Sequence, residues 1–99
     1  MLYSIVCTDS ENSLPKRKVA RPAHVDRLKK LAAEGRLILA GPNPQSGDPQ
    51  SEDKGFSGSI IIAQFDSEKE AREWAGQDPY IEAGVYSKVE IKPFIKVLP

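Results

Sequence analysis

The feature of this 99-residue sequence that most restricts its fold is the order in which strand-like and helix-like segments follow one another. Four segments have the alternating or β-branched apolar pattern of strands. In two others, apolar residues recur every three or four positions, which predicts helices. The predicted strands are 2–8, 36–41, 59–65 and 85–97; the predicted helices run from Pro22 to Gly35 and from Ser67 to Gly76. The order is therefore strand, helix, strand, strand, helix, strand.

This order predicts an α+β domain of the ferredoxin-like type (βαββαβ), with a four-stranded antiparallel sheet and two helices on one face. The chain is short enough to form a single domain over residues 1–99. The strands contain more apolar residues than one layer of helices can cover. We therefore expect a second copy to cover the open face of the sheet, which would make the protein a homodimer.

Local signals place the ends of the second helix and of a short turn after it. Ser67 and Glu70 form an S-x-x-E capping box before that helix. Asp78 followed by Pro79 is typical of a helix start, and we expect one helical turn there. Pro93 cannot donate a hydrogen bond within a sheet, which places the last strand at an edge or a bulge.

The start of the first helix is predicted at Pro22, because proline suits the first helical position. The preceding residues 9–21 are polar and contain a proline, so we expect a loop. Arg21 offers no side-chain acceptor to cap the first turn, whose N–H groups would need an acceptor from elsewhere. A carboxylate of Asp78 or of a substrate would fill that role, as would water. Residues 42–58 are predicted to form a long connection.

Charge and cysteine content exclude several classes of function. The 14 basic and 14 acidic residues cancel, and no basic run is interleaved with aromatic residues, which argues against nucleic-acid binding. The sequence contains no apolar run long enough to cross a membrane and no signal-peptide pattern, so we expect a cytoplasmic location. The single cysteine, Cys7, indicates neither an internal disulfide nor a zinc site. We expect no metal and no cofactor.

His24 is the only histidine in the chain, and it is the main candidate for chemistry. In helical projection it lies about 40° from the middle of the apolar stripe, so it should face the sheet. Burial favours a neutral imidazole, whereas a neighbouring aspartate favours imidazolium and fixes the tautomer. Such a histidine can be a core residue, a partner for an anion or a general base. The residues alone favour the core interpretation.

Other residues complete a candidate site. Arg17 and Arg21 have the charge to hold an anionic substrate. Asp78 is explained by helix capping alone, although it could also orient His24. Tyr80 could line a pocket or belong to the core. Ser59 lies in a strand without a nucleophile elbow, so we count it with the substrate-binding residues rather than as a nucleophile.

Three stretches resemble the YciI-like (YCII-related) family of small bacterial proteins: RPAHVDRLKKLAAEGRLILAGP, GFSGSIIIAQF and DPYIEAGVYSKVEIKPF. The combination R-P-x-H with a later D-P-Y carries the resemblance. This family is similar in fold to the dimeric α+β barrels, which implies a homodimer. The resemblance also implies a histidine–aspartate pair in a cleft, and the matching positions are His24 and Asp78. Its fold relatives include lyases, isomerases, dehalogenating enzymes and cofactor-free oxygenases, so the substrate stays open.

Two hypotheses follow. In the first, the protein is a cofactor-independent lyase, dehalogenase or isomerase acting on a small anionic or phenolic metabolite. Asp78 orients His24, His24 removes a proton, and Arg17 or Arg21 holds the anion. In the second, the protein is a non-catalytic dimeric module that binds a small molecule or a partner protein, and the pair clamps the first helix to the short turn. The first hypothesis requires an open pocket beside His24, whereas the second is satisfied by a sealed pair.

Overall fold

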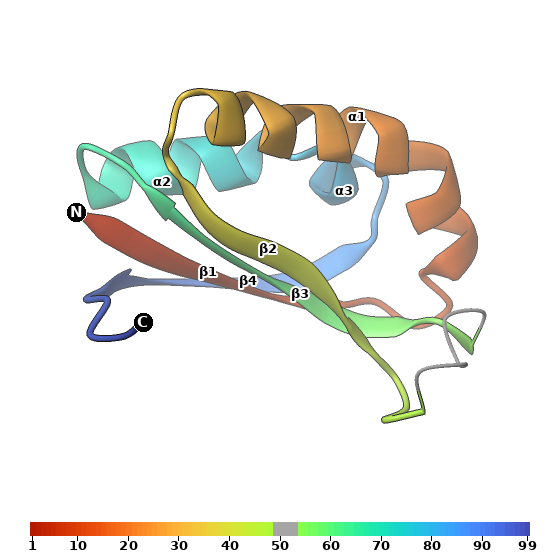
Figure 1. Ribbon diagram of the computed structural model, residues 1–99. Coiled ribbons are helices and arrows are strands. Elements are labelled where there is room, and N and C mark those ends of the chain that lie inside the picture. Colours follow the sequence, from red (N-terminus) through yellow and green to blue (C-terminus); the bar gives the residue numbers. More distant parts are fainter. Residues whose placement is uncertain (49–53) are drawn as a thin grey trace.

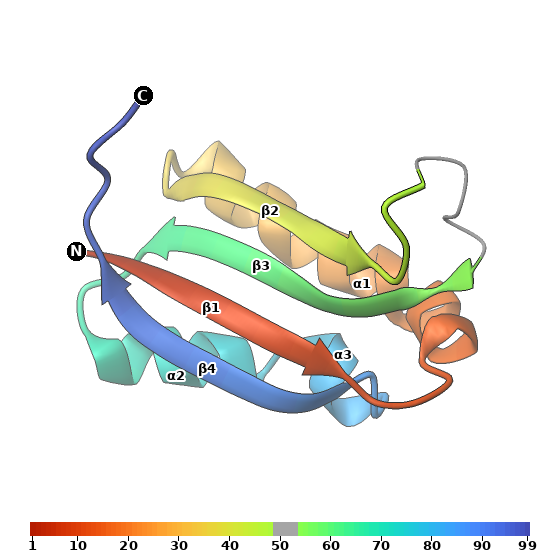
Figure 2. The same cartoon turned by 90° about the horizontal axis from the view of Figure 1, so that it is seen from below.

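A computed structural model describes residues 1–48 and 54–99, and it confirms the predicted fold class. Its elements are β1 (Leu2–Asp9), α1 (Leu14–Ala33), β2 (Leu37–Pro44), β3 (Phe56–Gln64), α2 (Glu68–Gly76), α3 (Pro79–Glu82) and β4 (Tyr86–Phe94). The strands form one antiparallel sheet in the order β2-β3-β1-β4. The three helices lie along one face of this sheet (Figure 1). The view from the opposite side shows the strands with no helix in front of them (Figure 2).

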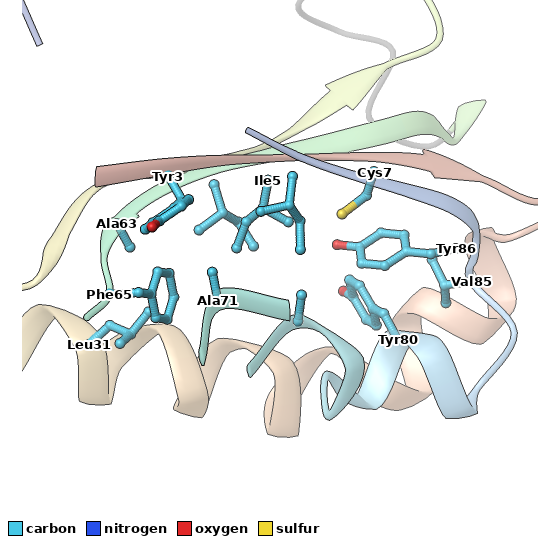
Figure 3. Close-up of a cluster of buried hydrophobic side chains, with 13 residues drawn as sticks. Tyr3, Ile5, Cys7, Leu31, Ala63, Phe65, Ala71, Tyr80, Val85 and Tyr86 are labelled. Atoms are coloured by element: carbon cyan, nitrogen blue, oxygen red, sulfur yellow. The ribbon is translucent and has the colours of Figure 1, made fainter. Parts of the chain in front are cut away.

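The hydrophobic core lies between the sheet and the helices (Figure 3). Alternate residues of the central strand β1, namely Tyr3, Ile5 and Cys7, are buried there. Ile5 pairs with Ile61 of β3, whose side chain is equally buried. Because neighbouring residues of a strand point to opposite faces, the residues between them face away from the helices. Burial raises the pKa of the Cys7 thiol to about 12, so it is no nucleophile at neutral pH.

The predicted start of the first helix is wrong. Helix α1 begins at Leu14, includes Pro15 in its first turn and continues through Pro22. Proline lacks the N–H that would bond to the carbonyl of Lys18, but Pro22 lies on the exposed side, where water can solvate a freed carbonyl. Most of residues 9–21 are therefore helical, not a loop.

Because α1 begins at Leu14, there is no uncapped helix start beside His24. His24 lies in the interior of α1, and Arg21 is not at an uncapped helix end. The backbone N–H groups beside His24 belong to the regular helical ladder, which leaves them no orphan donors for a ligand. Any chemistry at His24 must therefore come from side chains.

The connection between β2 and β3 is shorter than the predicted 42–58. Strand β2 extends to Pro44 and β3 begins at Phe56, so both ends of the predicted connection are strand. Prolines are tolerated in β2 because it is an edge strand, where one row of N–H groups has no partner strand. Residues 49–53 of the predicted connection lie outside the described residues.

Strand β4 is an edge strand, as Pro93 predicted, but it is shorter than expected. It ends at Phe94, and Ile95 and Val97 are 74% and 83% exposed rather than buried. The pairing with β1 shifts by one residue near Ser87. Such a bulge reverses the alternation. Tyr86 therefore faces the helices together with residues further along the strand.

The capping predictions for the shorter helices are confirmed. The Ser67 hydroxyl accepts a hydrogen bond from the backbone N–H of Glu70 at 3.1 Å, at the start of α2. The Asp78 carboxylate accepts one from the backbone N–H of Tyr80 at 2.9 Å, at the start of α3. The second cap positions a carboxylate directly beneath α1.

Candidate active site

His24 and Asp78, 54 positions apart in the chain, are hydrogen-bonded to each other in the structure. The imidazole Nδ1 lies 2.8 Å and 2.9 Å from the two carboxylate oxygens. Both residues are buried, at 7% and 4% exposure. A carboxylate can only accept, so Nδ1 carries the proton, and in the neutral ring Nε2 is then an unprotonated acceptor. The pair thus sets the tautomer that a base acting through Nε2 requires.

Aromatic rings hold the imidazole in place. The Tyr80 ring stacks on it with the ring centroids 3.9 Å apart and the planes 10° from parallel. The Tyr86 ring meets it edge-on at 6.5 Å. Burial raises the pKa of Tyr80 against the opposing effect of Arg17 and Arg21, so this phenol is protonated at neutral pH. Tyr80 is only 2% exposed, and most of its surface packs within the protein.

Arg17 is a buried residue of α1 and not part of a loop, as the prediction for residues 9–21 would have placed it. Its Nε and Nη2 donate to the two carboxylate oxygens of Asp9 at 2.7 Å and 2.8 Å. The hydroxyl of Ser13 donates to the same carboxylate. Burial alone would lower the pKa of Arg17, but Asp9 more than compensates and the pKa is raised. The guanidinium therefore stays charged, and Asp9 neutralises it locally.

Two further bonds fix the guanidinium against the sheet. Nη2 donates to the carbonyl oxygen of Gly58 and to the hydroxyl of Ser59, both at 2.9 Å. Its carbon lies 4.9 Å from the centre of the Phe56 ring and 5.1 Å from that of Tyr80. A side-chain hydrogen bond with Tyr80 adds to these contacts. Arg17 is therefore a rigid donor, held against the sheet beside the imidazole.

A cavity of about 330 Å³ lies between α1 and the strands β2 and β3, and it is open to solvent. This volume is at the small end of the range of roughly 300–1,000 Å³ typical of ligand sites. Five of the predicted site residues line it: His24, Arg17, Arg21, Ser59 and Tyr80. Asp78 lies behind the imidazole and is not part of the lining. His24 therefore borders an accessible space, which the enzyme hypothesis requires.

Two residues of this arrangement were missed in the sequence. Asp9 ends a strand in a polar stretch, and nothing in its local pattern indicates a buried ion pair with Arg17. Gly58 has a recognisable signal, because a glycine inside a strand pattern often marks a close approach of backbones. A side chain at Gly58 would collide with the carbonyl oxygen of Cys7 and press on Asn43.

We expect Gly58→Ala to lower the free energy of unfolding by about 1–3 kcal/mol, because the added methyl group must push strands apart. The carbonyl that accepts from Arg17 would move with the strand. Gly41→Ala is the matched control, since a Cβ there meets nothing within 4 Å. Urea denaturation of both variants measures the difference. Equal stability of the two would refute the close packing at Gly58.

The described residues contain no cluster of three or more His, Cys, Asp or Glu side chains that could hold a metal ion. None of the helices in residues 1–48 and 54–99 is both long and apolar enough to cross a membrane.

Known proteins with similar sequences or structures were identified. The family model of the YCII-related domain matches residues 1–95. An uncharacterised protein of Haemophilus influenzae is 52% identical over 97 residues, covering 98% of this chain and 99% of that protein. Protein YciI of Escherichia coli is 52% identical over 99 residues, with the same coverage. Among solved structures, the 5-chloro-2-hydroxyhydroquinone dehydrochlorinase of Burkholderia phenoliruptrix, in complex with 2,5-dihydroxybenzoquinone, is 27% identical, with a TM-score of 0.84, covering 96% of this chain and 94% of that one.

Proposed function

This chain belongs to the family of YCII-related domains, and we propose that it is a cofactor-independent enzyme in which His24 and Asp78 perform general acid–base chemistry on a small anionic or phenolic molecule. One observation carries the proposal. The Nδ1 side of the imidazole is held by a buried carboxylate, while the ring borders an open cavity. An oriented base beside an accessible space is the arrangement that proton abstraction needs.

In the proposed reaction, Nε2 of His24 removes a proton from the bound molecule. Asp78 stays ionised and stabilises the imidazolium that forms. The negative charge left on the substrate is stabilised by the guanidinium of Arg17, which lines the cavity and is held in place by its hydrogen bonds. In an elimination, the electron pair of the bond that held the removed proton then expels a leaving group. The proton passes from His24 to solvent. In an isomerisation, His24 returns the proton to another atom.

The dehydrochlorinase of B. phenoliruptrix supports the elimination route. Its name describes loss of hydrogen chloride from a chlorinated hydroxyhydroquinone, which is removal of a proton coupled to departure of chloride. The similarity extends over nearly the whole of both chains. Halogenated hydroquinones are therefore the first substrates to test on this protein.

The alternative function, a non-catalytic dimeric module that binds a small molecule or a partner protein, is favoured by the burial of the pair. His24 belongs to α1 and Asp78 caps α3, so their hydrogen bond joins two helices. Such a bond can serve stability alone. In this hypothesis, the cavity binds a ligand without changing it.

Chloride release tests the proposed function. The purified protein is incubated with 5-chloro-2-hydroxyhydroquinone and with chlorinated and brominated analogues, and free halide and quinone absorbance are followed. We expect protein-dependent halide release from at least one compound. Lys69→Gln, an exposed change on α2, serves as a control and should retain full activity. Compounds that bind in the cavity and are never turned over would favour the non-catalytic module.

We also propose that the protein is a homodimer formed through the open face of the sheet. Val6 and Leu39, which are 40% and 49% exposed, project from β1 and β2 away from the core. Val6 pairs with Ile60, and Leu39 pairs with Ile62, so apolar side chains adjoin across three strands of this face. An apolar surface of this kind is typically covered by a partner.

We expect Val6→Asp to convert the dimer to a monomer, because a carboxylate at the centre of an apolar interface has no partner. Light scattering coupled to size-exclusion chromatography measures the mass. Val19→Asp is the control, since Val19 is 84% exposed on α1, away from the sheet. A monomeric wild type at micromolar concentration, or a Val6→Asp variant that stays dimeric, would contradict this proposal.

A further inference from the structure

The cavity beside His24 is elongated. Its walls are α1 and, facing it, the strands β2 and β3; α1 lies over this side of the sheet (Figures 1 and 2). The lining residues of α1 extend from Arg17 to Ala32, about 22 Å at 1.5 Å per residue. Those of β2 extend from Leu37 to Pro42, about 16 Å at 3.3 Å per residue. The cavity therefore has the shape of a trough rather than of a compact pocket.

The two ends of the trough differ in chemistry. Pro42 pairs with Ser59, which places that end of β2 beside Arg17 and the polar side chains of the candidate active site. Leu37, at the other end of β2, pairs with Ala63. From the Leu37 end up to the polar end the trough is apolar, lined by side chains from α1, β2 and β3: Val25, Leu28, Leu37, Ala40 and Ile61.

Basic side chains of α1 line the trough. Arg17, Arg21 and Lys29 line it, and among the described residues no Asp or Glu does. Asp9 neutralises Arg17, whereas Arg21 and Lys29 take part in none of the ion pairs found in residues 1–48 and 54–99. Arg21 lies one turn before Val25 and Lys29 one turn after it, so the two cations flank the apolar stretch of α1.

We propose that Lys29 determines specificity by binding an anionic group of the substrate that is separate from the group reacting at His24. The substrate is then an acid with an apolar body: a carboxylate or similar anion at Lys29, and the acidic proton at His24. The two residues are about 7 Å apart along the helix axis. Helical side chains lean toward the N-terminus of their helix, and His24 lies on the N-terminal side of Lys29.

The assignment of the His24 end rests on the proposed function, but the anion at Lys29 does not. A compact phenol without a remote anion would occupy only the polar end and leave both Lys29 and the apolar walls without a partner. An acid with an apolar body satisfies the cation and covers the apolar side chains at once.

Binding of 4-hydroxyphenylacetate and of its neutral amide, 4-hydroxyphenylacetamide, tests this proposal by calorimetric titration of the full-length protein. The two probes share shape and phenol and differ in charge. We expect the wild type to bind the acid about five- to tenfold more tightly than the amide, as for a charged contact at a partly open site. The preference should shrink in 0.5 M salt.

Lys29→Gln should bring the affinity for the acid down to that for the amide and leave the amide affinity unchanged. Lys30→Gln is the matched control, because Lys30 is exposed on α1 as Lys29 is, but it is not part of the lining. Equal binding of the two probes by the wild type would overturn the proposal. So would a preference that survives Lys29→Gln, or a failure of both probes to bind at millimolar concentration.

The outcome is separable from that of the proposed function. If the preference depends on Lys29 but no compound is ever turned over, the anion site stands and the enzyme proposal fails. If halogenated hydroquinones are turned over while Lys29→Gln leaves the preference intact, the enzyme proposal stands and the anion site is overturned.

Discussion

Replacing Arg17 by methionine is expected to lower the free energy of unfolding by about 3–5 kcal/mol, because a buried charge would lose its partner. The side chain of Asp9 is 1% exposed, and two of its bonds come from this guanidinium. Methionine fills part of the volume but neutralises nothing. The loss should appear in urea denaturation followed by circular dichroism.

A comparison with a surface ion pair separates burial from charge. Arg72 lies 3.5 Å from Glu68 on α2, and both side chains are more than half exposed. Arg72→Met should change the free energy of unfolding by no more than about 0.5 kcal/mol. If Arg17→Met fails to fold, the double variant Asp9→Asn, Arg17→Met should restore part of the stability, since it removes the unpaired charge. A loss at Arg17 no larger than that at Arg72 would contradict this account of the buried pair.

The second large effect is expected in catalysis. His24→Asn should reduce turnover of a halogenated substrate by about 10²- to 10⁴-fold, the usual contribution of a general base. The asparagine amide can still donate to Asp78 in place of Nδ1, so the melting temperature should stay close to that of the wild type. Only Nε2, the nitrogen that acts as the base in the proposed reaction, is lost. Steady-state kinetics and thermal melts of the same preparation measure both quantities.

Asp78→Asn is the companion variant. Its amide oxygen can still cap α3 by accepting from Tyr80, but it no longer stabilises the imidazolium. We expect a loss of turnover with little loss of stability. Wild-type turnover in His24→Asn would refute His24 as the base. Unchanged turnover together with a sharp fall in stability would support the clamp of the second hypothesis.

The parts of the fold that the sequence predicted correctly depend on local signals. Ser67 caps α2 and Asp78 caps α3, because each hydrogen bond closes within three residues. The first half of α1 could not be predicted in this way. Its face toward the sheet carries the buried Arg17 rather than an apolar residue, so no hydrophobic period marks it. Pro22 then suggested a helix start where the chain was already helical.

In the candidate site, too, features with a local sequence signal were predicted, whereas contacts between distant residues had no such signal. Helical projection predicted that His24 faces the sheet, and it does. The contact with Asp78 spans 54 positions; the residues alone left it as one alternative beside helix capping, and the family resemblance implied it. The partner of Arg17 could not be predicted, because Asp9 reaches it only through the bend between β1 and α1. Long-range ion pairs have no pattern in a single sequence.

The central claim is that Asp78 holds the Nδ1 proton of His24 and leaves Nε2 as an unprotonated acceptor at the cavity. Since His24 is the only histidine, its two ring nitrogens give a single pair of signals in ¹⁵N-labelled protein, and no assignment is needed. At a pH where the ring is neutral, the spectrum should show a protonated Nδ1 and an unprotonated Nε2. The opposite tautomer, with the proton on Nε2, would contradict the account.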